Sequence, residues 1–591
     1  MNSLVAPLLA PRSVALLLAL SFSLSAAHAL TVLPLSLILG HGPFWDFPRG
    51  IVPGSASDMA DGLVGYLYFV QSSWTMPLLQ VPNLGDPAGT NIFWIDDAIG
   101  WVSILGKLIH ASTGAVVNLL GFYLFACFTL GGVAMTALIA AAGQRNLLGA
   151  VTGAVYGTAM PFFLFRWGHM ALGAQFLIVF GLGLYLKSRI APRNCRLTAA
   201  WLGLLSMTLL TNAYLFVMVG GCWAAALAQR RLNGATSTAE LTIEGAGVVG
   251  VILGLTLLMG ILSADLRFAG SNDFGLYSMN VASPVIPQMS GVVPGFADYR
   301  VGPEAEYEGF AYLGLGLLGL LVLSLPAALG WIRLRARSHA ALICVFACML
   351  LLAISNTVHL GDQLVFDLRL PEDLAYALGA LRSSGRFFWL VGYALAGGAI
   401  VLTLRRFRAA SATVVLALSC VTQLTDVQPI REAVAATAVQ PAHPAVDREA
   451  AAALVARSTA VLIFPSIGCV RHAIDEGSAA DSEEALLRQA NMEFQLLGAR
   501  ANLRINSVYN SRLATDCQAE DAALRQPLQS GALHVYLVSF LPSAAQLRGH
   551  EPSDVCSRLD WIRYCLVRSE SPDTERQRKS PPTRRGSLLI D

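Results

Sequence analysis

Long apolar runs separated by short polar connections dominate the chain as far as residue 425. An α-helix needs about 20 apolar residues to cross a hydrocarbon layer of about 30 Å. The runs therefore predict about eleven membrane spans, at residues 14–39, 114–141, 147–165, 171–188, 198–214, 215–229, 245–263, 310–332, 340–357, 386–404 and 410–425. Two runs are short, and the pair at 198–229 could instead form one kinked helix. The pattern predicts an all-α polytopic membrane domain over residues 1–428.

The first apolar run also has features of a secretory signal peptide. Arg12 precedes the apolar core, and Ala27-His28-Ala29 is similar to a cleavage site. The apolar run nevertheless continues to Gly40, which makes it long enough for a span. The sequence therefore favours retention of residues 1–29 in a first membrane helix over their cleavage.

After Asp426 the pattern changes to that of a soluble domain. Residues 429–570 make up about 140 residues, an ordinary size for one domain. The stretches 459–465 and 533–541 are typical of β-strands, and 482–503 is typical of a helix. We therefore predict an α/β or α+β domain, followed by a disordered tail at 571–591.

The distribution of positive charge predicts the orientation of the helices. With the N-terminus in the cytoplasm, every second connection is cytoplasmic, and the positive-inside rule expects Arg and Lys there. These connections carry Arg145; Lys187, Arg189, Arg193 and Arg196; Arg230 and Arg231; Arg333, Arg335 and Arg337; Arg405, Arg406 and Arg408. The outer loops are then 40–113, 264–309 and 358–385, and the C-terminal domain is extracytoplasmic. This assignment requires residues 95–110 to lie along the outer surface as a helix.

Composition agrees with a membrane protein. The chain is 55% hydrophobic and 13% charged, against about 25% charged residues in an average soluble chain. The mean hydropathy is +0.58. The net charge of +2 argues against a nucleic-acid partner.

The predicted C-terminal domain contains four cysteines, Cys469, Cys517, Cys556 and Cys565. In an oxidising compartment they predict two disulfides, with three pairings open. A zinc site is the alternative, but the chain offers no CxxC or HxxxH spacing for it.

The first outer loop collects carboxylates at Asp58, Asp61, Asp86, Asp96 and Asp97. Each could simply cap or begin a helix. Their recurrence among aromatic and apolar residues favours a chemical role, because an acid in such surroundings has a raised pKa and can act as a general base. Asp58, Asp96 and Asp97 are the candidate catalytic residues, and they could equally hold a divalent cation.

Further polar residues recur at the outer ends of predicted spans. Arg166 and His169 follow the third span, Arg382 and Arg386 precede a later one, and Glu308 begins another. The arginines could bind a lipid-linked phosphate or diphosphate, with His169 assisting. Glu308 could orient sugar hydroxyls. Interfacial anchoring and helix capping are the simpler interpretations of all these residues.

The centres of the predicted spans are almost free of charge, whereas transporters and ion relays place ionisable groups there. No P-loop, GxSxG or HExxH motif is present. Polar groups gathered at one depth favour an enzyme that acts on a lipid-linked substrate at the membrane surface.

Several motifs carry a resemblance to a known family. They are DMADG from Asp58, WTMPL from Trp74, PAGTNIFWIDD from Pro87, FRWGHMAL from Phe165, GLYSMN from Gly275, YEGFAYLGLG from Tyr307, AISN from Ala353 and RSSGRFFW from Arg382. Together they resemble a poorly characterised bacterial family of polytopic membrane proteins that is grouped with the GT-C-type glycosyltransferases. A cysteine-bearing outer domain after the last span is also similar.

The resemblance implies a polyprenyl-phosphate-linked sugar as donor and an acid of the first outer loop as catalytic base, which we carry onto Asp58 first, then Asp96 or Asp97. The predicted function is transfer of the sugar, with inversion, to an extracytoplasmic glycan or protein. A non-enzymatic lipid-glycan carrier of the cell envelope, or a glycan polymerase or ligase, are the alternatives. The predicted location is the bacterial inner membrane, with the C-terminal domain in the periplasm.

Overall fold

The computed structural model describes residues 10–51, 56–262, 274–296, 299–440, 442–474, 480–510, 515–538, 546–547 and 555–567. The chain divides into two compact units. Unit 1 contains residues 1–81, 90–443 and 509–514, and unit 2 contains residues 82–89, 444–508 and 515–591. Each unit therefore includes a short segment from the part of the sequence that mostly builds the other.

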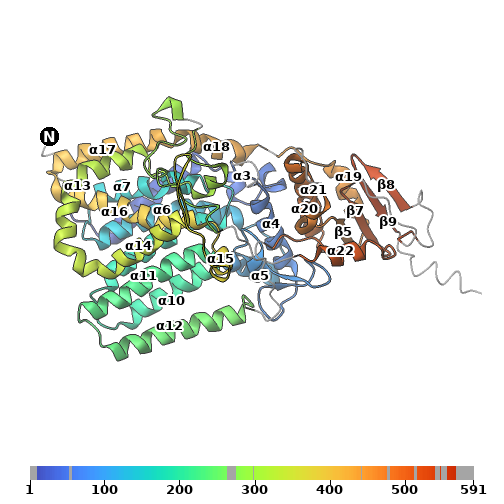
Figure 1. Cartoon of the computed structure of the whole chain (residues 1–591), viewed down its shortest axis with the longest axis horizontal. Coiled ribbons are helices and arrows are strands. Elements are labelled where there is room, and N and C mark those ends of the chain that lie inside the picture. The colour runs from blue at the N-terminus through green and yellow to red at the C-terminus, as the bar shows by residue number, and fades with distance from the viewer. Residues whose placement is uncertain are drawn as a thin grey trace, which may run out of the picture. The chain divides into compact units, whose positions relative to one another are not determined.

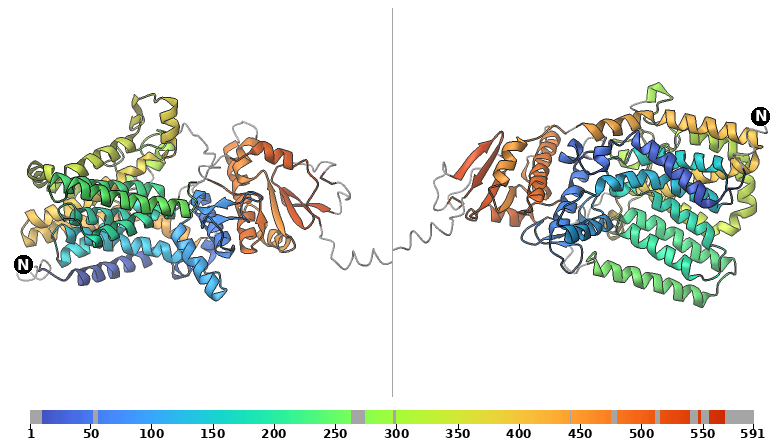
Figure 2. Two further views of the ribbon diagram at one scale, coloured as in Figure 1. Left: turned by 90° about the horizontal axis from the view of Figure 1, so that it is seen from below. Right: turned by 180° about the vertical axis from the view of Figure 1, so that it is seen from behind.

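Unit 1 is almost entirely helical, and its long helices run side by side (Figures 1 and 2). Its α-helices are α2 Val14–Leu30, α3 Leu35–Ile38, α4 Ala56–Gln71, α5 Gly100–Thr113, α6 Leu120–Ala141, α7 Leu147–Thr158, α8 Pro161–Leu164, α9 Phe176–Ser188, α10 Cys195–Leu209, α11 Ala213–Leu232, α12 Thr238–Leu258, α13 Leu315–Arg335, α14 Ala340–Ile354, α15 Glu372–Gly379, α16 Phe388–Arg406, α17 Ala409–Asp426 and α18 Gln428–Val439. Short 3-10 helices and strands connect them: η1 Pro43–Asp46, β1 Gln80–Val81, β2 Thr90–Asn91, η2 Ile92–Trp94, η3 Ala171–Gly173, η4 Pro294–Phe296, η5 Glu304–Gly309, η6 Ala336–His339, β3 Thr357–Leu360, β4 Gln363–Asp367 and η7 Ser384–Phe387.

Each predicted apolar run contains a helix, as expected for segments that must satisfy their backbone groups internally in lipid. Within the described residues, six helical stretches are long and apolar enough to cross a membrane: Leu120–Ala141, Ala171–Ser188, Thr238–Leu258, Leu315–Ile354, Ser384–Arg406 and Ala409–Asp426. Shorter apolar helices lie at Val14–Leu30, Leu147–Thr158 and Cys195–Leu209. The protein is thus a membrane protein with several apolar helices, but the predicted count of about eleven spans is not confirmed.

Connections rich in arginine meet one another. The backbone N–H of Arg12 donates to the carbonyl of Arg145 at 2.8 Å, and the Arg189 guanidinium donates to the carbonyl of Ser338 at 3.3 Å. The candidate span Ser384–Arg406 begins beside Arg386 and ends in Arg405 and Arg406. Residues predicted for the site and residues predicted to face the cytoplasm therefore lie at opposite ends of this helix. Which end faces the cytoplasm stays a prediction.

A buried carboxylate fixes the chain around Glu308. Asp426, at the end of α17, accepts hydrogen bonds from the hydroxyls of Ser290 and Tyr312 and from the backbone N–H of Leu315, the last two at 2.8 Å. Asp426 is 1% exposed, and its donors supply the partners that a buried carboxylate needs. The segment between Ser290 and Leu315, which carries η5, is therefore held at both ends.

Unit 2 is built on a mixed sheet with strand order β6-β5-β7-β9-β8. β5 is parallel to β6 and β7, whereas β9 is antiparallel to β7 and β8. The elements of unit 2 are α19 Arg448–Val455, β5 Ala460–Phe464, η8 Ile467–Cys469, α20 Val470–Ala473, α21 Ala480–Arg500, β6 Arg504–Ile505, α22 Cys517–Ala523, β7 Ala532–Tyr536, β8 Cys556–Leu559 and β9 Ile562–Leu566. The predicted C-terminal region of mixed strands and helices is confirmed.

The predicted disulfides are confirmed, and the structure decides between the open pairings. Cys469 is bonded to Cys517, and Cys556 is bonded to Cys565. The predicted disordered tail at 571–591 lies outside the described residues, as do the last residues of the predicted strand at 533–541.

Candidate functional site

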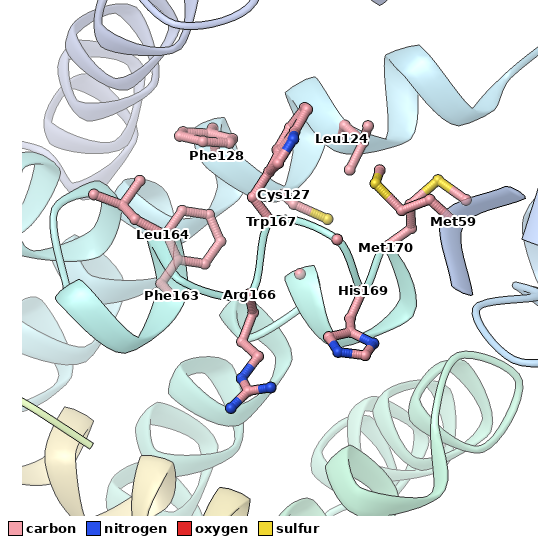
Figure 3. Close-up of a pocket in the computed structure, with 12 residues that line it drawn as sticks. Met59, Leu124, Cys127, Phe128, Phe163, Leu164, Arg166, Trp167, His169 and Met170 are labelled. Atoms are coloured by element: carbon pink, nitrogen blue, oxygen red, sulfur yellow. The ribbon is translucent and has the colours of Figure 1, made fainter. Parts of the chain in front are cut away.

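The loop between α8 and η3 carries Arg166 and His169. Figure 3 shows both side chains projecting to the same side, away from apolar neighbours such as Phe128 and Leu124. The cavity beside the loop has a volume of only about 20 Å³, which is room for little more than one water. The loop thus presents two cationic side chains, and the space for a larger ligand lies elsewhere.

Asp97 fixes this loop. Its two carboxylate oxygens accept hydrogen bonds from the backbone N–H groups of Met170 at 2.7 Å and Ala171 at 3.1 Å. Burial, with repulsion from two neighbouring aspartates, outweighs the attraction of His169 and raises the pKa of Asp97 to about 7. Asp97 therefore joins the segment 40–113 to the Arg166 loop.

Glu308, in η5, is shared by several cations. Its Oε2 accepts hydrogen bonds from Nη1 of Arg166 at 2.8 Å and Nη2 of Arg386 at 2.7 Å, and its Oε1 lies 3.4 Å from Nε2 of His169. Burial alone would raise the pKa of Glu308, but the two guanidiniums hold it well below its usual range. Three cationic groups thus contact one carboxylate, and the two guanidiniums are charged donors of the kind that bind phosphate.

Two glycines allow Glu308 and Arg386 to meet. A Cβ atom on Gly385 would lie 2.6 Å from the Cα of Gly309, and one on Gly309 would lie 2.0 Å from the carbonyl oxygen of Ser278. Neither position has room for a side chain, so η5 and η7 approach backbone to backbone. This close approach positions the carboxylate and the guanidinium within hydrogen-bonding distance.

Asp58, in the first turn of α4, pairs with His169. Oδ2 of Asp58 lies 3.0 Å from Nδ1 of His169, whose side chain is 12% exposed. Burial lowers the pKa of His169, but the carboxylates of Asp58 and Glu308 outweigh this effect and raise it to about 10. At neutral pH the ring is therefore an imidazolium, and it links Asp58 to the cluster around Glu308.

A larger cavity lies next to this cluster. Its volume of about 410 Å³ is within the range typical of small-ligand sites. One part of the wall is charged and the other apolar or aromatic, with Arg386 over the Tyr214 ring at 4.9 Å. The lining residues are Phe93, Trp94, Ile95, Asp96, Asp97, Ala98, Gly100, Ala171, Leu210, Thr211, Asn212, Ala213, Tyr214, Tyr376, Ala377, Ala380, Leu381 and Arg386. Such walls suit a ligand with both a charged and an apolar part.

Arg382 lies between two tyrosines. Its guanidinium is 5.7 Å from the centre of the Tyr277 ring and forms a side-chain hydrogen bond with Tyr509. Burial, followed by the charge of Asp96, raises the pKa of Tyr509, while Arg382 opposes this. Arg382 is therefore connected to Asp96, an acid of the segment 40–113, through a residue far along the chain.

The segment that carries Tyr509 is fixed within unit 1 by its neighbour. The hydroxyl of Thr90 donates to Oδ1 of Asn510 at 2.8 Å, and Asn510 forms an antiparallel bridge with Ile95. These contacts hold Tyr509 close to Asp96, the residue after Ile95.

The candidate acids do not form a metal site in the structure. Among the described residues, no group of three or more His, Cys, Asp and Glu side chains is arranged to hold a metal ion. Asp97 directs both oxygens to backbone N–H groups, and Asp58 directs one to His169. Asp97 and Asp58 therefore already use carboxylate oxygens in contacts within the protein.

Comparison with protein families assigns the chain. The family described as Domain of unknown function (DUF6311) matches residues 22–428, and the family described as DUF6311 C-terminal domain matches residues 450–567. The chain belongs to the DUF6311 family. No curated protein sequence matches it significantly. The site residues from Asp58 to Arg386 fall within the first DUF6311 match, and Tyr509 falls within the second.

Solved structures that match the chain at low similarity include the oligosaccharyltransferase of Archaeoglobus fulgidus. Its apo form has a TM-score of 0.42 and 12% sequence identity, with 83% of this chain and 64% of that chain covered. Its complex with zinc and sulfate has a TM-score of 0.42 and 10% identity, with coverage of 83% and 62%.

The structure brings most of the predicted site residues of this DUF6311 chain together. Five of them are linked by successive side-chain contacts: Asp58, His169, Glu308, Arg166 and Arg386. Asp96, Asp97 and Arg386 line the larger cavity. Arg382 is connected to this group through Tyr509. The sequence analysis missed Tyr509, because it lies in the predicted soluble domain with no motif around it. Only the tertiary structure shows that residues 509–514 belong to unit 1. The chemical roles of the predicted residues stay predictions.

Proposed function

We propose that the protein is a membrane glycosyltransferase that moves a sugar from a polyprenyl-phosphate donor to an extracytoplasmic acceptor, a glycan or a protein. The observation that supports this best is the cavity of about 410 Å³, in which Asp96 and Arg386 share a wall with aromatic and apolar side chains. A lipid-linked sugar phosphate combines an anion, a polar sugar and an apolar chain, and this wall offers a partner to each.

In the proposed reaction, the phosphate binds near Arg386 and Arg382. The acceptor hydroxyl attacks the anomeric carbon and gives its proton to a carboxylate of the first outer segment. The bond between the anomeric carbon and the phosphate oxygen breaks, and the lipid phosphate leaves with the electron pair. The arginines stabilise the negative charge that develops on the leaving group. Attack from the face opposite the phosphate inverts the anomeric configuration.

Two carboxylates qualify as the base in this proposal. Asp96 lines the cavity, whereas Asp58 contacts the cation His169. Asp97 uses both oxygens to fix the Arg166 loop, so we propose it as a positioning residue. Glu308 binds both guanidiniums, and we propose that it orients Arg386 for the phosphate rather than binding sugar hydroxyls directly.

The test is a mass spectrum of envelope glycans from cells that carry the wild type, Asp58→Asn or Asp96→Asn. Loss of a general base slows such reactions by about 10²–10⁴-fold, so we expect loss of one sugar modification in at least one variant at unchanged membrane levels. Asp46→Asn is the matched control, because Asp46 is an exposed acid earlier in the same outer segment. It should leave the modification unchanged.

A binding-only function as a lipid-glycan carrier is the second candidate. Two of the candidate acids already have partners that compete with a role as general base, which favours this function. Asp97 accepts hydrogen bonds from two backbone N–H groups, and Asp58 contacts His169. An unchanged modification in both Asp58→Asn and Asp96→Asn, combined with its loss in Arg386→Met, would reject the transferase and support the carrier.

A further inference from the structure

Strands β3 and β4 form a two-stranded ribbon, called here the apolar ribbon (residues 357–367), which is fixed along one edge. The backbone N–H of Val281 donates to the carbonyl of His359 at 3.0 Å, and Asn280 exchanges hydrogen bonds of 2.8 and 3.0 Å with the backbone of Gly361. Nδ1 of His359 lies 2.7 Å from Oε1 of the buried Glu306. The ribbon is therefore held in place along β3 by the outer segment that also carries Glu308.

The other strand of the apolar ribbon presents apolar side chains. Every residue of β4 is exposed, and Leu364, Val365 and Phe366 are 56%, 61% and 54% exposed. Val358 pairs with Phe366 and His359 pairs with Leu364, which leaves Val365 as an extra residue in an irregular register. Paired residues share a face and successive residues of β3 alternate, so Leu364 and Phe366 expose apolar side chains on opposite faces of the ribbon. A two-stranded ribbon cannot cover such side chains by itself, and an open apolar edge strand in water invites aggregation.

The position of the apolar ribbon along the chain indicates what covers it. Helix α14 ends at Ile354, in the candidate membrane span Leu315–Ile354, and β3 begins at Thr357. Leu351, in the last turn of α14, is 65% exposed. The ribbon therefore follows directly on the end of a candidate membrane span.

We propose that the apolar ribbon inserts β4 into the lipid headgroup layer of the membrane leaflet nearest the candidate site. Lipid can surround both faces of a strand, whereas a protein partner docked on a strand commonly covers one. The backbone groups along the outer edge of β4 and the exposed carboxylates of Asp362 and Asp367 need polar surroundings. The strand therefore stays at the depth of the headgroups and does not reach the hydrocarbon core.

Insertion of the ribbon has a consequence for the site. Helix α15 follows the ribbon, and its residues Tyr376 and Ala377 line the cavity that also contains Asp96 and Arg386. The ribbon would therefore fix one wall of this cavity at the level of the lipid headgroups. The insertion itself does not depend on the proposed transferase activity.

The experiment is photo-crosslinking of the full-length protein in phosphatidylcholine nanodiscs. A benzophenone side chain replaces Leu364 or Phe366, the two β4 positions that lie on opposite faces of the ribbon. Val365 carries the same probe in a third variant. The same probe in place of Leu351 is the positive control. In place of Arg471, whose side chain is 81% exposed in unit 2, it gives the background for a water-exposed position. The readout is the yield of lipid adduct measured by mass spectrometry.

We expect lipid adducts at both β4 positions, at yields close to that of the Leu351 probe and several-fold above the Arg471 background. The double variant Leu364→Ser/Phe366→Ser should lower the adduct yield of the Val365 probe several-fold, because polar side chains weaken insertion. Yields at the Arg471 background, adducts from only one face, or crosslinks to protein in place of lipid would each overturn the proposal. The Leu351 probe reports in every case whether the protein is correctly embedded.

Discussion

Replacing Glu308 by glutamine tests the electrostatic centre of the site. The substitution keeps the size of the side chain but removes the charge that Arg166 and Arg386 share at 2.8 and 2.7 Å. The side chains of Arg166 and Glu308 are only 2% and 6% exposed, so water cannot replace the lost partner. Glu308→Gln therefore leaves two buried guanidiniums and an imidazolium without their shared anion.

The expected cost follows from burial. Removing one partner of a buried ion pair commonly costs about 3–5 kcal/mol, because the remaining charge stays buried without compensation. An exposed pair contributes only about 0–1 kcal/mol. We therefore expect Glu308→Gln to lower the free energy of unfolding by about 3–5 kcal/mol, whereas the control Glu372→Gln, at an exposed acid of α15, should change it by less than about 0.5 kcal/mol.

The assay is unfolding of the purified protein in mixed micelles by increasing SDS, followed by circular dichroism. A double-variant cycle with Arg166→Met isolates the interaction, because Arg166→Met/Glu308→Gln removes the uncompensated charge together with its partner. The double variant should lose clearly less than the sum of the single losses. A Glu308→Gln variant as stable as the Glu372→Gln control, or additive effects within about 0.5 kcal/mol, would refute the reasoning.

Three further predictions follow from the same structure. The neighbouring carboxylates outweigh burial and raise the pKa of His169 from 6.5 to about 10, so the stabilisation by the imidazolium is complete below pH 6.5 and is lost as pH rises toward 10. The His169→Gln variant should therefore show a smaller decrease in the free energy of unfolding between pH 6.5 and 10. An unchanged pH dependence would contradict this assignment. Tyr509→Phe removes the hydroxyl that contacts Arg382 and should lower the free energy of unfolding in SDS by about 0.5–1.5 kcal/mol. A variant as stable as the wild type would rule out a contribution of this contact. Cys469→Ser removes a disulfide between residues 48 apart in the sequence, and Cys556→Ser removes one between residues 9 apart. The first variant should destabilise unit 2 more, because its disulfide closes the longer loop. Thermal unfolding that ranks the two variants in the opposite order would count against this account.

Much of the architecture could be predicted from local pattern alone. Apolar runs specify helices because a helix satisfies its own backbone groups, and the change of composition after Asp426 separates a region that contains strands. The four cysteines of that region also predicted disulfides correctly, but their pairing remained open. Pairing depends on which Cα atoms come within bonding distance, and neighbouring residues do not contain that information.

The candidate site shows the same division. Acids on the segment 40–113 and arginines at the ends of apolar runs could be recognised in the sequence, because charges beside apolar runs are costly to bury and therefore stand out. Their partners were not visible. Glu308 meets Arg166 and Arg386 only because η5 and η7 approach at Gly309 and Gly385.

The sequence by itself determined which segments are helical and which residue types are available for chemistry. Only the tertiary structure decided that Asp58 pairs with His169, that Asp97 fixes a loop, and that Tyr509 lies beside Arg382. The physical reason is the range of the forces involved. Helix formation and membrane insertion depend on residues a few positions apart, whereas each contact of the site joins segments that meet only after the helices have packed.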